Sequence, residues 1–511
     1  MTFRCLPFFL FGLAPLGAAP AVVEPGASAP QPVIPMRTER TGRLPLREVI
    51  RLTLERNPLI EIRREAVAAA WAGEVEADAA FDPTLSATLD AGKTRQASAA
   101  SELDGSSQPE SDAFGATTGV EKPMRDGSSV GVEWDALDRS STNSSFSSLN
   151  PSYDSALRLT LRKPLLRGSG REVRFPMEFA RLDSLRTAEE WRAEIEEVLL
   201  DVEKSYWEIQ ARSLEKGIRE QGLELARLIL EETEARGSTK VEVLEARANV
   251  VRREAGIAQA KKDYDDALDE LFRLAGLIGQ SEPGALALDA LPAAEGPVPD
   301  TGASYADAIA NGVEARLEEN ALQAARVEME RAKLGLRPTL DLAASGGVLG
   351  RDGSYGPSNK AMIEGDGRFY QAGLELRFPW DLRAEKARLK QAESRLKQEN
   401  GRIENARLEL FTSMREITRR VSTGLELLRA AATAVELNRA RFEEQRARRA
   451  AGEAILRDVL EAQTALDVAL LEELRARLDV ISARLELERA RGMLPARHGL
   501  ALDLRVSSPD L

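Results

Sequence analysis

The chain has 511 residues, of which 43% are hydrophobic and 30% are charged, a composition typical of a folded protein. Its net charge of −13 argues against a nucleic-acid partner, because proteins that neutralise phosphates carry the opposite charge. With one His and one Cys, the chain lacks the ligands of a zinc site and the groups of thiol or Ser–His–Asp catalysis. The composition therefore predicts no enzyme, no metal site and no cofactor.

The first 21 residues are typical of an export signal. Arg4 supplies a positive charge, residues 6–16 are apolar, and small residues at 19–21 provide a cleavage site. We therefore expect residues 1–21 to be removed together with Cys5, so that the mature chain forms no disulfide bond. Residues 22–43 are rich in Pro and predict a flexible lead-in.

A first structural unit is predicted over residues 44–278, and it begins with a helix that runs to about residue 80. Asn57-Pro58 is expected to interrupt this helix, because Pro removes a helix hydrogen bond. Residues of about 83–164 then alternate apolar and polar positions, a period of two that indicates strands. Within this region, residues 113–138 predict two additional strands around a turn.

A long helix is predicted over residues 170–236 and a return helix over residues 240–277. Ile195, Val198 and Val202 belong to an apolar seam with spacings of three and four residues. At 1.5 Å per residue, the long helix would extend about 100 Å, so it needs a partner along its length, as coiled coils do. Residues 279–302, which contain several Pro residues, predict a linker near the middle of the molecule.

The second half, residues 303–495, repeats the first. Pro83 and Pro338 stand in similar segments that are 255 residues apart, and the preceding helices align at the same offset without a gap. The expected elements are listed in chain order as a helix, a β-hairpin over about 338–378 with a Gly-rich loop at 349–367, a long helix over 381–450 and a return helix over 454–493. Residues 496–511 form a C-terminal tail, in which His498 is expected to be solvated.

The lengths of these helices suggest how they pack. One return helix and one lead-in helix together are about as long as one long helix. We therefore expect two short helices to stack end to end beside each long helix, with the linker at 279–302 near their joint.

Three segments carry a resemblance to a known family. They are the Pro-Thr-Leu that follows each lead-in helix, Lys163–Gly168 (KPLLRG), and Ala451–Leu466 (AGEAILRDVLEAQTAL). In this order, and within a duplicated chain, they resemble the TolC-like outer-membrane efflux family. The resemblance covers residues of about 44–495.

The resemblance implies a mostly α-helical homotrimer. In this family, long coiled-coil helices form an α-barrel tunnel through the periplasm, and each chain gives four strands to a shared transmembrane β-barrel. It also implies contact with outer-membrane lipid, a periplasmic adaptor protein and an inner-membrane pump, and a location in the outer membrane that extends into the periplasm. The implied function is passive conduction of substrates in a tripartite efflux or type I secretion system.

The resemblance also implies roles for residues near the helical tips. Asp458 and Glu461 match acidic positions that surround the periplasmic constriction, where a trimer would place six carboxylates around a narrow pore and attract cations. Glu242 and Glu245 are their equivalents in the first repeat. Docking of the adaptor is expected at the tips, whose residues are Arg236, Gly237, Ser238, Ala451, Gly452 and Glu453.

Several alternatives remain open at this level. The additional strand pair over residues 113–138 exceeds the family's usual hairpin and either enlarges the barrel or projects outside it. An exported periplasmic coiled-coil scaffold, or an adaptor without a pore, is the alternative function. Drugs, metal ions and polypeptides are all carried by relatives, and the sequence does not choose among them.

Overall fold

The computed structural model describes most of the chain. The described residues are 44–95, 97, 108–141, 148–277, 288–378 and 380–500. The expected export signal and lead-in, residues 501–511 of the expected tail and residues 279–287 of the expected linker lie outside them.

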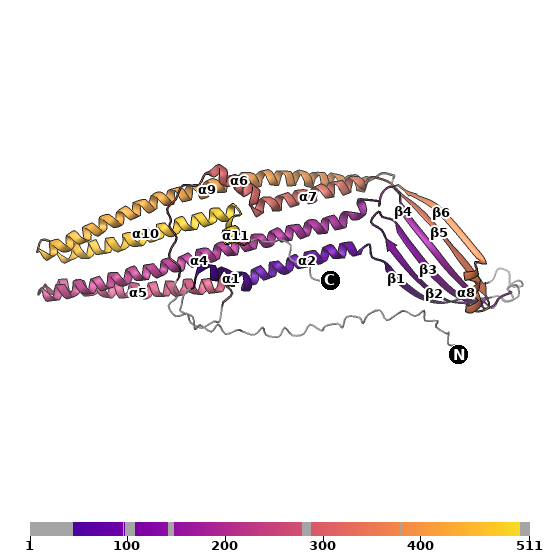
Figure 1. Ribbon diagram of the computed structural model, residues 1–511, viewed down its shortest axis with the longest axis horizontal. Helices are drawn as coiled ribbons and strands as arrows, with labels where there is room; N and C mark the ends of the chain where they lie inside the picture. Colours follow the sequence, from indigo (N-terminus) through magenta and orange to yellow (C-terminus); the bar gives the residue numbers. More distant parts are fainter. Residues whose placement is uncertain are drawn as a thin grey trace, which may run out of the picture.

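Two long helices organise the molecule, which is elongated, with helices at one end and a sheet at the other (Figure 1). Helix α4, Phe175–Ala235, has 61 residues, and helix α9, Arg383–Ala450, has 68 residues. At 1.5 Å per residue, they are about 90 and 100 Å long. Among the helices that the structure describes, none is both long enough and apolar enough to cross a lipid bilayer.

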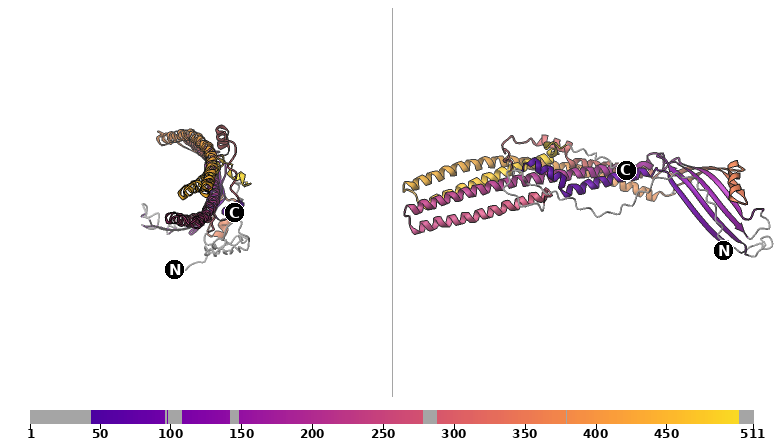
Figure 2. Two further views of the ribbon diagram at one scale, coloured as in Figure 1. Left: turned by 90° about the vertical axis from the view of Figure 1, so that its left-hand side faces the viewer. Right: turned by 60° about the horizontal axis from the view of Figure 1, so that its bottom comes forward.

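Shorter helices lie end to end beside each long helix. Helix α4 packs against α2, Pro58–Ala79, and α5, Lys240–Leu274, while α9 packs against α7, Val313–Leu334, and α10, Leu456–Ala490. Both α7 and α10 also contact α4, so four helices stand side by side at either level. Viewed along the molecule, they form a curved layer (Figure 2).

Short helices mark the joints of these stacks. Helix α1 covers Leu46–Arg56, α6 covers Thr301–Asn311, the 3-10 helix η1 covers Glu172–Arg174, and α11 covers Leu494–Arg497. Between α1 and α2, the Asn57 side chain accepts a hydrogen bond from the Leu59 backbone N–H at 2.8 Å and donates one to the Leu274 carbonyl at 2.7 Å. The interruption expected at Asn57-Pro58 is therefore present, and it fixes the end of α5 beside the start of α2.

The repeat is visible in the helix boundaries. Helices α1 and α6, like α2 and α7, begin and end 255 residues apart. Beyond the strands, the starts of α4 and α9 are only 208 residues apart, because Phe175 corresponds to Arg383. The first repeat therefore contains a longer strand region than the second.

A single antiparallel sheet of six strands accounts for this difference. Its strands are β1 Thr84–Arg95, β2 Glu110–Pro123, β3 Ser129–Ser141, β4 Ser152–Pro164, β5 Thr339–Asp352 and β6 Gly367–Arg377. They pair in chain order from β1 to β6. The additional strand pair expected over residues 113–138 corresponds to β2 and β3 and lies inside this sheet.

One expected loop contains a helix. Residues 349–367 were predicted as a Gly-rich loop, but β5 extends to Asp352 and α8 covers Tyr355–Glu364. Helix α8 packs on the sheet through Ser358, whose buried hydroxyl contacts the Ser155 hydroxyl and the Gly350 carbonyl, both at 3.0 Å. The helix is thus stabilised by tertiary contacts that the local sequence does not reveal.

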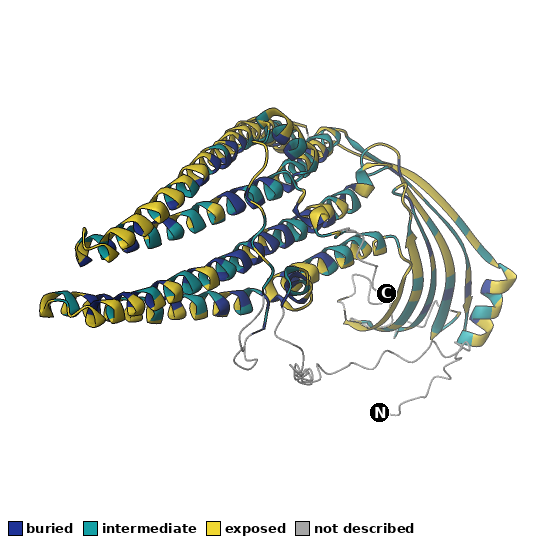
Figure 3. Ribbon diagram, turned by 60° about the vertical axis from the view of Figure 1, so that its left-hand side comes forward, coloured by how far each residue is buried: buried dark blue, intermediate teal, exposed yellow. Residues whose placement is uncertain are grey.

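The largest hydrophobic core lies at the middle of the helical layer. It joins α1, the end of α5 and the central parts of α4, α9 and α10, and Leu199, Tyr206 and Leu271 are among its fully buried residues. The Tyr206 hydroxyl donates to the Leu44 carbonyl and accepts from the Asp289 backbone N–H, each at 2.8 Å. Buried residues follow the helices, whereas most residues of the sheet are exposed or half-buried (Figure 3).

Candidate functional sites

The first helical tip lies between α4 and α5. Helix α4 ends before Gly237, whose φ of 68° is a left-handed conformation that favours glycine. Thr239 then begins α5 as its N-cap, and its side chain accepts a hydrogen bond from the Glu242 backbone N–H at 3.3 Å. Of the expected docking residues, Arg236, Gly237 and Ser238 all belong to this turn.

The Glu242 carboxylate completes the same cap. It accepts a hydrogen bond from the Thr239 backbone N–H at 3.0 Å, so Thr239 and Glu242 form a reciprocal capping box. Glu245 lies one turn further along α5 and is exposed. The two acidic residues expected to be equivalent thus have different surroundings, and Glu242 has a structural role that the sequence analysis did not identify.

The second helical tip lies between α9 and α10. Gly452 has a φ of 81° and ends α9, while Ala451 and Glu453 flank it. The Glu453 carboxylate lies 3.9 Å from the Arg448 guanidinium. Ile455 occupies the N-cap position of α10 and provides no side-chain hydrogen bond, so this tip lacks the reciprocal cap of the first.

Asp458 and Glu461 lie on the first turns of α10, three residues apart and therefore on one side of the helix. Glu461 is 68% exposed and lies 3.8 Å from the Arg441 guanidinium of α9. Asp458 is half-buried and has no ion pair among the described residues. Glu461 also borders a shallow groove between α9 and α10, together with Asn438 and Thr464.

Polar contacts join the two tips of one chain. The Arg236 guanidinium donates to the Arg449 carbonyl at 2.9 Å, and the Arg449 guanidinium donates to the Thr233 hydroxyl at the same distance. Arg446 forms an ion pair with Glu232 at 2.9 Å. Burial lowers the pKa of Arg449, although nearby Glu242 opposes this effect. The two expected docking turns are therefore adjacent.

A hydrophobic cluster lies behind these contacts. Its buried members are Ile229, Ala246, Phe442, Leu456, Val459 and Ala462, which come from α4, α5, α9 and α10. All four helices therefore contribute to one small core at the tips. This core holds the two helical hairpins of the chain together.

Two further contacts between the hairpins are buried. Arg253 of α5 forms an ion pair with Asp467 of α10 at 2.5 Å, and the Gln463 side-chain amide donates to the Gly222 carbonyl at 2.9 Å. A Cβ atom at Gly222 would lie 2.6 Å from the Arg253 guanidinium, so glycine leaves room for the pair. Burial raises the pKa of Asp467, and Arg253 offsets this only in part. These residues, far apart in sequence, had no recognisable signal.

The prediction for His498 was wrong. Its imidazole is 14% exposed, and its Nε2 atom contacts the Glu203 carboxylate, which is completely buried in α4. The His498 side chain is therefore not solvated. The reason is that α11 packs on α4 and brings the following residues to the helical layer.

The sheet has two faces of opposite character. Ladder partners lie on the same face, whereas neighbours along a strand point to opposite faces. One row across all six strands contains Leu85, Val120, Val132, Leu159, Gly346 and Tyr370. The adjacent row, shifted by one residue, contains Thr84, Glu121, Gly131, Thr160, Ser345 and Gln371. The first face is apolar and the second is polar.

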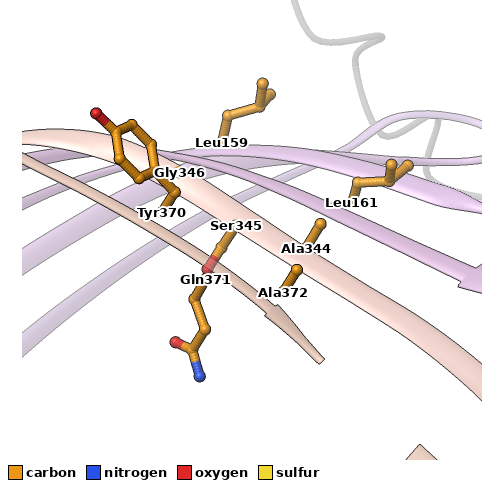
Figure 4. Close-up of a pocket in the computed structure, with 8 residues that line it drawn as sticks. All are labelled: Leu159, Leu161, Ala344, Ser345, Gly346, Tyr370, Gln371 and Ala372. Atoms are coloured by element: carbon orange, nitrogen blue, oxygen red, sulfur yellow. The ribbon is translucent and has the colours of Figure 1, made fainter. Parts of the chain in front are cut away.

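The apolar face is unusually exposed for large hydrophobic side chains. Leu159 is 55% exposed and Tyr370 is 86% exposed. Small residues, among them Ala344 and Ala372, leave a shallow hollow of about 540 Å³ between these larger side chains. Figure 4 shows Leu159, Leu161 and Tyr370 on one side of the sheet and Gln371 on the other. An extended apolar surface of this kind marks contact with a membrane or a partner.

The polar face carries ion pairs between strands. Arg162 of β4 lies 2.8 Å from Asp341 of β5, and Arg158 of β4 lies 3.8 Å from Asp135 of β3. Asp135 also accepts a hydrogen bond from the Thr117 hydroxyl of β2 at 2.9 Å. This face is therefore suited to water. Across the part of the chain that the structure describes, no group of three or more His, Cys, Asp and Glu residues is arranged to hold a metal ion.

Comparisons with known proteins agree with this geometry. Residues 307–493 match the sequence model of the outer membrane efflux protein family. The outer-membrane channel OprN shares the fold at 17% identity with a TM-score of 0.65, covering 88% of this chain and 89% of its own. The CmeC outer membrane channel of Campylobacter jejuni aligns at 15% identity with a TM-score of 0.62, covering 88% of this chain and 85% of its own.

A third structure gives the same result. The MtrE outer membrane channel of Neisseria gonorrhoeae, in its open state, aligns at 16% identity with a TM-score of 0.61, covering 88% of this chain and 89% of its own. No curated protein matches the sequence. The resemblance to outer-membrane efflux proteins is thus confirmed, and the fold of this chain is that of outer-membrane channels.

Proposed function

We propose that this chain is the outer-membrane channel component of a tripartite efflux or type I secretion system. It would passively conduct substrates received from an inner-membrane pump across the periplasm and the outer membrane. The observation that carries the proposal is the two-faced sheet, which continues directly from a helical layer about 100 Å long. A lipid-compatible surface and a long hydrophilic conduit are the two requirements of such a channel.

The strands have the length that a membrane requires. They contain 11 to 14 residues each, and a tilted strand needs about 9–11 residues to cross the hydrocarbon core. Within one chain, β1 and β6 each pair on one side only. Because unpaired backbone groups are unstable in lipid, other copies of the chain would pair with these edges. Following the family resemblance, we propose three copies and a shared transmembrane β-barrel.

The helices would form the periplasmic tunnel. In a homotrimer, the curved helical layers would close into an α-barrel whose far end carries the tips. We assign adaptor docking to the turns Arg236–Ser238 and Ala451–Glu453 because they lie side by side and end the molecule. Each pair of tips, held by its own polar contacts and hydrophobic cluster, would act as one docking unit.

The constriction is assigned mainly to Asp458 and Glu461. Both lie on the first turns of α10, and three copies would bring six carboxylates to the narrow end. Exposed Glu245 can add to this charge. Glu242 belongs to the same region but is bound in the cap of α5, so its contribution to the pore would be smaller. The ring would favour cations over anions.

The apolar face also weighs against the alternative of a periplasmic scaffold or adaptor without a pore. A water-exposed scaffold gains nothing from a row of exposed leucine, valine and tyrosine side chains across six strands. Native mass spectrometry of protein extracted from outer membranes tests the proposal, and we expect a trimer. A monomer recovered from the soluble periplasmic fraction would support the scaffold instead.

A further inference from the structure

The additional strands β2 and β3 are full members of the sheet. Strand β1 pairs with β2 along its whole length, from Thr84↔Glu121 to Arg95↔Glu110. Strand β3 pairs with β4 from Ser129↔Arg162 to Arg139↔Ser152. The pair is therefore inserted between β1 and β4, and it separates these two strands.

Both faces of the sheet continue across the inserted pair. On the apolar face, Val120 of β2 and Val132 of β3 are 45% and 47% exposed, close to the 55% of their ladder neighbour Leu159. On the polar face, Glu121 and Glu133 occupy the neighbouring positions along the same strands. A hairpin that projected into water would have no need of this division.

The directions of the strands permit closure with further copies of the chain. Neighbouring strands are antiparallel throughout, so β1 and β6 run in opposite directions. The β6 edge of one copy can therefore pair antiparallel with the β1 edge of the next. The two edges also match in length, with 12 residues in β1 and 11 in β6.

The width of the sheet matches the width of the helical layer. Four helices side by side, at spacings of about 8–10 Å, occupy about 32–40 Å of the wall. Six strands at spacings of about 4.8 Å, tilted by about 40°, occupy about 38 Å, whereas four strands would occupy only about 25 Å. The wall therefore continues from helices to strands without narrowing only if β2 and β3 take part.

We infer that β2 and β3 are wall strands of the membrane pore, so that each chain contributes six strands rather than the four of the family's usual pattern. This inference rests on the proposed function. Three copies of the six-stranded sheet give a barrel of eighteen strands. Such a barrel is as wide as the helical tunnel beneath it, so the outlet places no narrower limit on cargo size than the tunnel does.

Matched arginine substitutions test whether β3 faces lipid. Leu159→Arg on β4 and Val132→Arg on β3 place the same charge at partnered positions of the apolar face. We expect both variants to lower the amount of membrane-inserted trimer at least tenfold, because arginine within the hydrocarbon core is costly. Glu133→Arg, on the polar face of β3, is the control and should insert normally. Normal insertion of Val132→Arg together with failure of Leu159→Arg would overturn the inference.

Electron cryomicroscopy of the unaltered protein in lipid nanodiscs gives a test without substitutions. A trimer with eighteen strands in cross-section is expected. A trimer with twelve wall strands and the β2–β3 pair outside would overturn this inference and leave the proposed function intact. Particles without a closed membrane ring would overturn the proposed function, and the inference with it.

Discussion

Two carboxylates at the second tip have different surroundings, which bears on their proposed role. Glu461 is mostly exposed beside Arg441, while Asp458 is half-buried in the first turn of α10. Replacing both by Asp458→Asn/Glu461→Gln removes six charges from a trimer without changing side-chain size. We expect the cation-to-anion permeability ratio to fall several-fold, measured from reversal potentials in a salt gradient.

A control for this prediction is available on the same helix. Asp479 is exposed on α10, about six turns from the tip pair. Asp479→Asn should leave the permeability ratio unchanged if selectivity arises at the tips. An equal loss of selectivity in both variants would point to the general charge of the tunnel rather than to a constriction.

The cap of α5 is a second residue-scale feature. Thr239→Ala removes the side chain that accepts from the Glu242 backbone N–H, which costs about 1 kcal/mol in typical helices. Hydrogen exchange of the backbone amides in the first turn of α5 should therefore accelerate about fivefold. Ser238→Ala is the matched control, since the Ser238 hydroxyl has no hydrogen bond among the described residues. Equal exchange in both variants would contradict a stabilising role for the cap.

Residue positions were predicted from the sequence better than residue contacts. The Gly residues that end the long helices and the acidic residues beyond them were found correctly, because helix ends have local signals. The His498 contact with buried Glu203 was missed, since those residues are 295 positions apart. Glu242 was read as a pore residue because its capping geometry depends on the backbone of the turn.

At the scale of helices, the pair of Arg253 and Asp467 connects the two hairpins. Arg253→Met leaves the Asp467 carboxylate buried without its cation, and we expect the protein to lose roughly 3 kcal/mol of stability. The double variant Arg253→Met/Asp467→Leu should recover most of this loss, as measured by thermal unfolding in detergent. Arg227→Met removes the exposed pair with Glu254 and should cost under about 1 kcal/mol. A double variant no more stable than the single one would contradict this account.

Three helices meet at Glu486. Burial would raise the pKa of this carboxyl, but hydrogen bonds from Lys204 of α4 and Arg420 of α9 outweigh it, and the pKa is lowered. Since the folded pKa lies below the unfolded value of about 4.3, the stabilisation is present above that pH and is lost as the pH falls through the folded pKa.

A substitution tests this pH dependence. Glu486→Gln should make the unfolding temperature less sensitive to pH between about 5 and 3, because the titrating group is gone. The matched control is Glu319→Gln, an exposed glutamate of α7 with no ion pair among the described residues. The unfolding temperature of the control should follow that of the unaltered protein. An unchanged pH profile for Glu486→Gln would contradict the assignment.

Elements with strong periodicity were predicted well, and the others were not. The 255-residue offset and the end-to-end helices followed from periodicity and length, both of which are local properties. Helix α8 was read as a loop because Gly356, Pro357 and Ser358 favour turns, while its packing on β4 and β5 supplies the stabilisation. The place of β2 and β3 was undetermined, since alternation predicts a strand but not its neighbours.

At the scale of the whole molecule, the account makes one central claim. The apolar face, the two open sheet edges and the long curved helical layer are parts of a single conduit. None of them is explained well by a monomer in water, because the sheet would expose both apolar side chains and unpaired backbone groups. Association of copies around the polar face satisfies all three features at once.

Single-channel recording of the purified protein in planar lipid bilayers tests this claim most directly. We predict discrete, cation-selective openings, because the conduit is lined by the polar face of the sheet and ends at the acidic tips. Protein that is folded and trimeric, yet produces no conductance under any applied voltage or salt gradient, would contradict the account and leave the scaffold as the better description.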